Sequence, residues 1–188
     1  MIRRQVAVIY HSITGTTEQL AGAISEGVNS ISDVDAVEYR IQGCEIVEGR
    51  FVDEQALDIV TNANAVIFGS PTFMGSVSSQ FKAFADASSD LWADKKWSGK
   101  VAAGFTIGSN LSGDQLHTIQ YLQILAGQHG MLWAGIDIPG GYDEMNRNRL
   151  GAQSGLIAHT NDSDVNSSDL ETARYLGARV AGLAKRLN

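Results

Sequence analysis

The stretch Tyr10-His-Ser-Ile-Thr-Gly-Thr-Thr17 lies between a hydrophobic run and a helical pattern, and it decides the fold. Before it, Val6–Tyr10 is apolar throughout, which predicts a short strand buried on both faces of a sheet. After it, apolar residues recur at helical spacing from Leu20 to Ile31, which predicts an amphipathic helix over about 16–30. The chain therefore begins with a strand, a glycine-bearing turn and a helix.

The turn has the composition of a phosphate-binding loop. Its hydroxyl side chains and its one glycine are Ser12, Thr14, Thr16, Thr17 and Gly15. A glycine lets the backbone turn tightly and approach a ligand closely. The N-terminus of the following helix would offer unpaired N–H groups and the positive end of its dipole to an anion. No Lys or Arg lies between residues 5 and 39, so we expect hydroxyls and backbone amides to do all the binding.

Other interpretations of this turn have to be weighed. A Rossmann turn is excluded because G-x-G-x-x-G is absent, and a Walker loop is excluded because no Gly-Lys-Ser/Thr follows. An ordinary βα turn remains open, since Ser and Thr commonly cap helices. The rest of the chain has to decide between a phosphate loop and a helix cap.

Length and composition limit the classes of function. The 188 residues predict a single domain over 1–188. A net charge of −7 without a basic cluster argues against nucleic acid and anionic membranes as partners. The single Cys44 excludes an intrachain disulfide, and the histidines show no metal-ligand spacing, so no metal site is expected. Residues 1–10 do not form a signal peptide and no apolar run approaches about 18 residues, which predicts a cytoplasmic protein without a membrane span.

Strands and helices alternate along the chain, which predicts an α/β fold with a parallel sheet. Further strands are expected at Val34–Arg40, Ala65–Gly69, Lys100–Thr106 and Met131–Ile138, and further helices at 52–60, from Val77 onward, at 114–129 and at 169–187. The fifth strand is interrupted by an insertion that begins at Pro139-Gly140-Gly141, with Leu156–Ala158 as its continuation. The alternation of five strands with helices predicts a flavodoxin-like, doubly wound five-stranded sheet in the order 2-1-3-4-5. Ligands of such sheets bind beyond the carboxyl ends of the strands, where the loops 11–17, 70–76 and 106–113 would meet.

The first turn resembles the FMN-phosphate loop of flavodoxin-like proteins, and the whole chain resembles the WrbA-type NAD(P)H:quinone oxidoreductases. The motifs that carry this resemblance are Ser12–Thr17, Phe68–Thr72, Leu91-Trp92, Gly99-Lys100, His129-Gly130-Met131, Ala173–Gly177 and Val180–Ala184. They occur in the order and at the spacing of that family, and the insertion in the fifth strand fits it as well.

The resemblance implies FMN as cofactor and a role for each loop. The phosphate would be bound by Ser12, Ile13, Thr14, Gly15, Thr16 and Thr17. The edge of the isoalloxazine ring would be lined by Pro71, Thr72, Phe73, Met74 and Gly75. The ribityl chain and the ring would be bordered by Thr106, Ile107, Gly108, Ser109 and Asn110.

Two residues outside these loops also acquire roles from the resemblance. His129 would face the site as the catalytic residue and hydrogen-bond a quinone oxygen, although a histidine at a helix end can equally be a structural residue. Trp92 would lie near the flavin of a neighbouring subunit in a homotetramer, or else be a core or interface aromatic. Trp92 and Trp97 lie in a polar segment, which we expect at the surface.

The sequence departs from the family in each part of the expected site. Phe73-Met74 stands where the family often has Arg-Phe, so an arginine is missing beside the flavin. The run 108–113 has fewer glycines than in the family, and Gln128 replaces a common second histidine before His129.

These observations predict an FMN-dependent oxidoreductase that passes hydride from NAD(P)H to a small-molecule quinone. Donor and acceptor would share one pocket, which implies ping-pong kinetics. A flavodoxin-type electron carrier is the main alternative, and a flavin-binding regulatory protein without its own substrate is the other.

Overall fold

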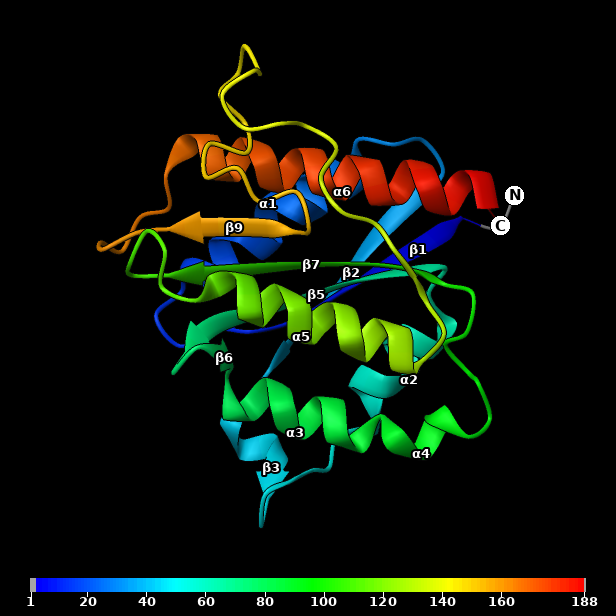
Figure 1. Ribbon diagram of the computed structural model, residues 1–188. Coiled ribbons are helices and arrows are strands. Elements are labelled where there is room, and N and C mark those ends of the chain that lie inside the picture. Colours follow the sequence, from blue (N-terminus) through cyan, green and yellow to red (C-terminus); the bar gives the residue numbers. More distant parts are fainter. Residues whose placement is uncertain (1–2, 188) are drawn as a thin grey trace.

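A parallel sheet runs through the middle of the molecule (Figure 1). The computed structural model describes residues 3–187. Its strands β2 (Val34–Ile41), β1 (Arg4–His11), β5 (Ala65–Phe73) and β7 (Val101–Gly108) pair in this order, all in parallel. The amino end of β7 pairs with β8 (Leu132–Trp133) and its carboxyl end with β9 (Leu156–His159). These two short strands together form the interrupted fifth strand, so the predicted order and the predicted interruption are both confirmed.

Helices cover both faces of the sheet, which is why its central strands are apolar on both sides. In Figure 1, α1 (Thr16–Asn29) and α6 (Ser167–Leu187) lie on one face, and α2 (Glu54–Asn62), α3 (Ser79–Ala87) and α5 (Gln115–Gln128) lie on the other, where α4 (Ser89–Trp92) follows α3. Neighbouring side chains of β1 enter opposite layers of the core. Val8 packs in the cluster of α1 and α6, whereas Ile9 packs in the cluster of α3 and α5.

The insertion between β8 and β9 is tied to the body of the protein by two arginines. In Figure 1 it crosses the sheet edge and projects past α6. Arg147 pairs with Asp143 of the same loop at 2.8 Å. Arg149 pairs with the buried carboxylate of Asp169 at the start of α6, at 2.7 Å, and also donates to the backbone carbonyl of His159. Arg149 therefore fastens the insertion to α6 through a carboxylate, whereas Arg147 braces the loop internally and contacts α6 through the Tyr175 ring, 4.7 Å from its centroid.

Two segments differ from the sequence-based expectation. The predicted loop 70–76 is largely strand, because β5 continues to Phe73 and turns back into β6 (Ser76–Val77). The predicted polar connection after β2 contains a 3-10 turn, η1 (Gly43–Glu45), and a small hairpin of β3 (Ile46–Val47) and β4 (Arg50–Phe51). Hairpins of two-residue strands leave no hydrophobic periodicity long enough to detect in a sequence.

The expectation that Trp97 lies at the surface is wrong. Its side chain is fully buried, stacks on Phe84 and donates from Nε1 to the hydroxyl of Thr61 at 3.0 Å. Trp92, in contrast, is 53% exposed. The polar residues around Trp97 in the sequence therefore gave no sign that it belongs to the core. The turn after α4 brings its side chain back into the core cluster of α3 and α5.

Glycines set how closely α1 and α6 approach each other. A β-carbon added at Gly27 would lie 1.9 Å from the backbone oxygen of Arg174, and one added at Gly177 would lie 2.0 Å from that of Ile24. Real β-carbons cannot come so near to backbone oxygen, so any side chain at either position requires the two helices to separate.

This contact predicts opposite effects for two alanine substitutions on α6. Gly177→Ala should lower the free energy of unfolding by about 1–3 kcal/mol, as overpacking does. Gly182→Ala has open space around its new methyl group and should raise the free energy by about 0.5–1 kcal/mol, because alanine favours a helix. Urea unfolding of both variants measures the difference, and equal values would contradict the close-packing argument.

Candidate functional site

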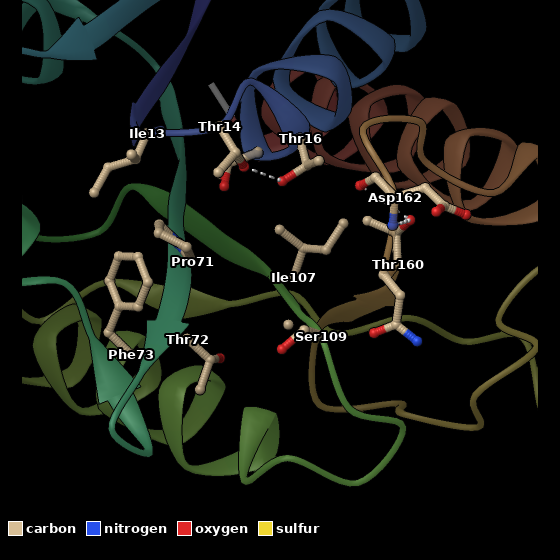
Figure 2. Close-up of a pocket in the computed structure, with 13 residues that line it drawn as sticks. Ile13, Thr14, Thr16, Pro71, Thr72, Phe73, Ile107, Ser109, Thr160 and Asp162 are labelled. Carbon is tan, nitrogen blue, oxygen red and sulfur yellow. Dashed lines mark hydrogen bonds between the residues drawn. The ribbon is translucent and has the colours of Figure 1, made fainter.

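A cavity of about 340 Å³ lies beyond the carboxyl ends of the central strands (Figure 2). Its volume is that of a small-ligand site. The predicted residues that line it are Ile13, Thr14, Thr16, Thr17, Pro71, Thr72, Phe73, Ile107, Gly108 and Ser109. Three loops that are distant in sequence meet here because β1, β5 and β7 are paired in parallel and end at the same edge.

The first loop is closed by hydrogen bonds to Ser12. The buried Ser12 hydroxyl accepts from the amide of Gly15 at 3.2 Å and from that of Glu18 at 3.4 Å. Gly15 has φ of 90°, a conformation that side chains disfavour, and its β-carbon position is open. Ser12 and Gly15 therefore shape the loop from outside the cavity lining.

The loop leaves both amides and hydroxyls for a phosphate. The first N–H groups of an α-helix have no acceptor within the helix. Glu18 uses its amide on Ser12, which leaves those of Thr16 and Thr17 for a ligand. The hydroxyls of Thr14 and Thr16 lie 3.1 Å apart at the cavity wall, as Figure 2 shows. Neutral donors around a helix N-terminus fit an FMN phosphate.

Buried hydroxyls support the other wall. The Thr72 hydroxyl contacts those of Thr106 and Thr118, each at 2.8 Å. Thr106 and Thr118 are fully buried, so they orient Thr72 rather than line the cavity. Thr118 was not among the predicted residues, because a single threonine within a helix has no distinctive sequence signal.

The hairpin of β5 and β6 forms the rim of the cavity. Met74 and Gly75 make its turn with φ of 46° and 78°, and neither lines the cavity. The backbone carbonyl of Gly75 lies 2.6 Å from Nδ1 of His117 at the start of α5. Phe73 stays 46% exposed at the rim. An arginine is indeed absent at this position, so the wall here is apolar.

A fourth loop completes the cavity and was missed by the sequence analysis. Thr160, Asn161 and Asp162 follow β9 and line the cavity. Thr160 and Asp162 lie across it from Ile13 and Phe73 (Figure 2). The loop is fastened to α1 through Gln19, whose side chain donates to the carbonyl of Ser163 at 2.7 Å. Its position follows from β9 being the end of the fifth strand. Asn110 lies just outside the cavity, and its carbonyl accepts from the buried Gln115 side chain at 2.6 Å.

His11 contributes no positive charge to this site. Its ring is buried, and burial, followed by the nearby Arg40 charge, lowers the pKa of His11. A histidine with a lowered pKa is neutral at pH 7.

His129 and Trp92 lie outside the first cavity. They line a second cavity of about 570 Å³ between α3, α4 and the second half of α5, with Arg50 of β4 at its wall. His129 therefore does not face the ligand loops of its own chain, because α5 starts at the carboxyl edge of the sheet and ends at the amino edge. Its 14 residues separate the two edges by about 20 Å. Any contact of His129 with a flavin therefore requires a flavin site from another subunit.

The surroundings of His129 are those of a buried residue. Its ring is 6% exposed and lies 4.4 Å from the Trp97 ring, centroid to centroid. Nε2 of the ring is 2.9 Å from the Ser88 hydroxyl, and Nδ1 is buried without a partner among the described residues. Burial lowers the pKa of His129, which favours the neutral ring.

A family model described as NADPH-dependent FMN reductase matches residues 6–136. The chain belongs to this family. Among its relatives, Flavodoxin FldP of Pseudomonas aeruginosa is 36% identical, with 98% of both chains covered. The probable NAD(P)H dehydrogenase (quinone) FQR1-like 2 of Arabidopsis thaliana is 29% identical, with 97% of this chain and 72% of the relative covered.

Solved structures agree with this assignment. The crystal structure of the flavodoxin, WrbA-like protein from Agrobacterium tumefaciens has a TM-score of 0.77 and 39% identity, covering 98% of this chain and 99% of that one. The resemblance to WrbA-type proteins and the flavodoxin-like fold are thereby confirmed. Family membership also bears out the expectation of FMN as cofactor and NAD(P)H as electron donor.

The sequence predicts neither a metal site nor a membrane span, and the structure describes residues 3–187 of the chain. No group of His, Cys, Asp or Glu side chains in this part of the chain is arranged to hold a metal ion. None of the helices described there is long and apolar enough to cross a membrane.

The geometry of the first loop predicts a strong preference for FMN over riboflavin. Riboflavin lacks the phosphate and forfeits its charge-assisted hydrogen bonds, at about 1.5–3 kcal/mol each, so it should bind at least about tenfold more weakly. Titration of the apoprotein with both flavins, followed by flavin fluorescence, measures the ratio. Equal affinities would contradict the phosphate-loop assignment and show that the loop only caps the helix.

Proposed function

We propose that the protein is an FMN-dependent NAD(P)H:quinone oxidoreductase. The observation that carries the proposal is the division of the first cavity into two parts. In Figure 2 the hydroxyls of Thr14 and Thr16 lie at the start of α1, whereas the apolar side chains of Ile13 and Phe73, 59% and 46% exposed, lie together on another side of the cavity. A flat aromatic substrate would cover these exposed apolar groups.

The protein residues would bind and orient, whereas the cofactor would react. When bound, FMN would supply the redox chemistry, a two-electron exchange between NAD(P)H and a quinone. Thr14, Thr16 and Thr17 would hold the phosphate end, while Pro71 and Phe73 would position the ring edge. Nicotinamide and quinone would enter at the same rim in turn, which accounts for the proposed ping-pong order.

An electron carrier without its own substrate is the second candidate. It is favoured by the relative named Flavodoxin FldP, which is matched along nearly the full length of both chains. The two candidates differ in whether a nicotinamide reduces the protein directly.

Anaerobic half-reactions distinguish the two candidates. For an oxidoreductase, NADH or NADPH should bleach the bound flavin directly, and benzoquinone should then restore its absorbance. The carrier hypothesis predicts that neither nicotinamide bleaches the flavin, whereas dithionite reduces it in two separate one-electron stages. Stopped-flow absorbance at the flavin band is the measurement.

The catalytic role proposed for His129 requires the protein to form an oligomer. The cavity of Trp92 and His129 can meet a flavin only in an oligomer, so we propose a homotetramer in which one copy presents this cavity to the flavin of another. Light scattering should then report a mass near four chains. A monomer at micromolar concentration would remove both residues from the site.

Substitution of His129 tests its part in the reaction. In the tetramer, His129→Ala should slow reoxidation by quinone about tenfold, a modest loss for one hydrogen-bond donor, with FMN affinity unchanged. Ser88→Ala is the control, since it removes the Ser88–His129 hydrogen bond and keeps the ring. If His129→Ala keeps wild-type rates and only lowers the melting temperature, the residue is structural.

A further inference from the structure

A cation contacts the phosphate loop, although the loop sequence contains none. Arg40 is the last residue but one of β2 and pairs in register with Tyr10, directly before the loop. Its Nη2 donates to the backbone carbonyl of Ser12 at 2.8 Å, and its Nη1 pairs with the Glu18 carboxylate at 2.7 Å. The guanidinium thus joins the end of β1 to the first turn of α1.

The first contact fixes the residue on which the loop closes. Ser12 accepts from Arg40 through its carbonyl and from the amides of Gly15 and Glu18 through its hydroxyl. Ser12 is therefore held on both its backbone and its side chain, and the amides left for a phosphate keep their directions as a result.

The second contact removes an unfavourable charge. Glu18 is the acidic residue in the first turn of α1, where a carboxylate stabilises the helix dipole but repels a bound phosphate. The Arg40 ion pair balances that charge at short range. His11 cannot do so, because the ring is buried and its lowered pKa keeps it neutral.

Arg40 is half-buried, although its ion-pair partner Glu18 is 47% exposed. The Arg40 side chain is 33% exposed, and its Nε is buried without a partner among the described residues. Burying a guanidinium donor without an acceptor costs stability, so the arrangement is not explained by stability alone.

We propose that Arg40 is a positioning residue for the FMN phosphate. It acts through Ser12, by holding the loop in its binding conformation, and through Glu18, by cancelling a repulsive charge. The inference rests on the FMN site and not on the quinone reaction, because flavin binding can be measured without any turnover.

A double-mutant cycle on FMN affinity tests this proposal. Arg40→Gln should weaken FMN binding about tenfold, the size of one charge-assisted hydrogen bond, and leave riboflavin binding unchanged. Glu18→Gln should bind FMN at least as tightly as the wild type. The double variant should recover part of the loss, because position 18 no longer carries an uncompensated negative charge beside the phosphate.

Rescue and control variants separate positioning from general loss of structure. Arg40→Lys keeps the charge and should restore part of the FMN affinity. Arg3→Gln is the matched control: it removes the Arg3–Asp35 ion pair at the opposite end of β2 and should leave the ratio of FMN to riboflavin affinity unchanged. Equal losses for FMN and riboflavin, unaltered FMN binding in Arg40→Gln, or a lysine variant as weak as the glutamine one would each overturn the proposal.

Discussion

The parallel pairing of β1, β5 and β7 is the constraint on which the rest of the structure depends. Their register brings Tyr10, Gly69 and Phe105 side by side in the sheet, so the loops that follow the three strands emerge at one edge. Close packing enforces this pairing. A β-carbon at Gly69 would lie 2.1 Å from the ring of Phe105, which fills the space that glycine leaves free.

Carboxylates near the cavity are neutralised by arginines from outside the phosphate loop, and the loop itself contains no cation. Arg40 reaches the loop from the neighbouring strand and pairs with Glu18, while Arg149 pairs with Asp169 behind the fourth loop. The phosphate loop itself offers amides and hydroxyls. Such a site can hold a phosphate without a surplus of positive charge, which is consistent with the net charge of −7.

The first cavity lies at the carboxyl edge of the sheet and the second lies among α3, α4 and the second half of α5, and helix direction explains the separation. Each helix after a strand starts at the carboxyl edge and returns to the amino edge. The start of α5 therefore brings His117 to the hairpin at the cavity rim, whereas its end carries His129 to the other cavity, beside Trp97. The same helix thus supports the rim of the first cavity at one end and contacts an aromatic cluster at the other.

Local pattern was enough for the alternating strands and helices, the interrupted fifth strand and the turn Ser12–Thr17, because burial on both faces and helical periodicity leave signals within a few residues. The strand order followed from the doubly wound topology that such alternation favours. Contacts between distant residues decided the remainder. Arg40 meets Ser12 through strand pairing, Thr160–Asp162 close the cavity because β9 ends at the shared edge, and His129 lies away from it because of the direction of α5. Residues far apart in the chain become neighbours only through the register of the sheet, and no local pattern encodes that register.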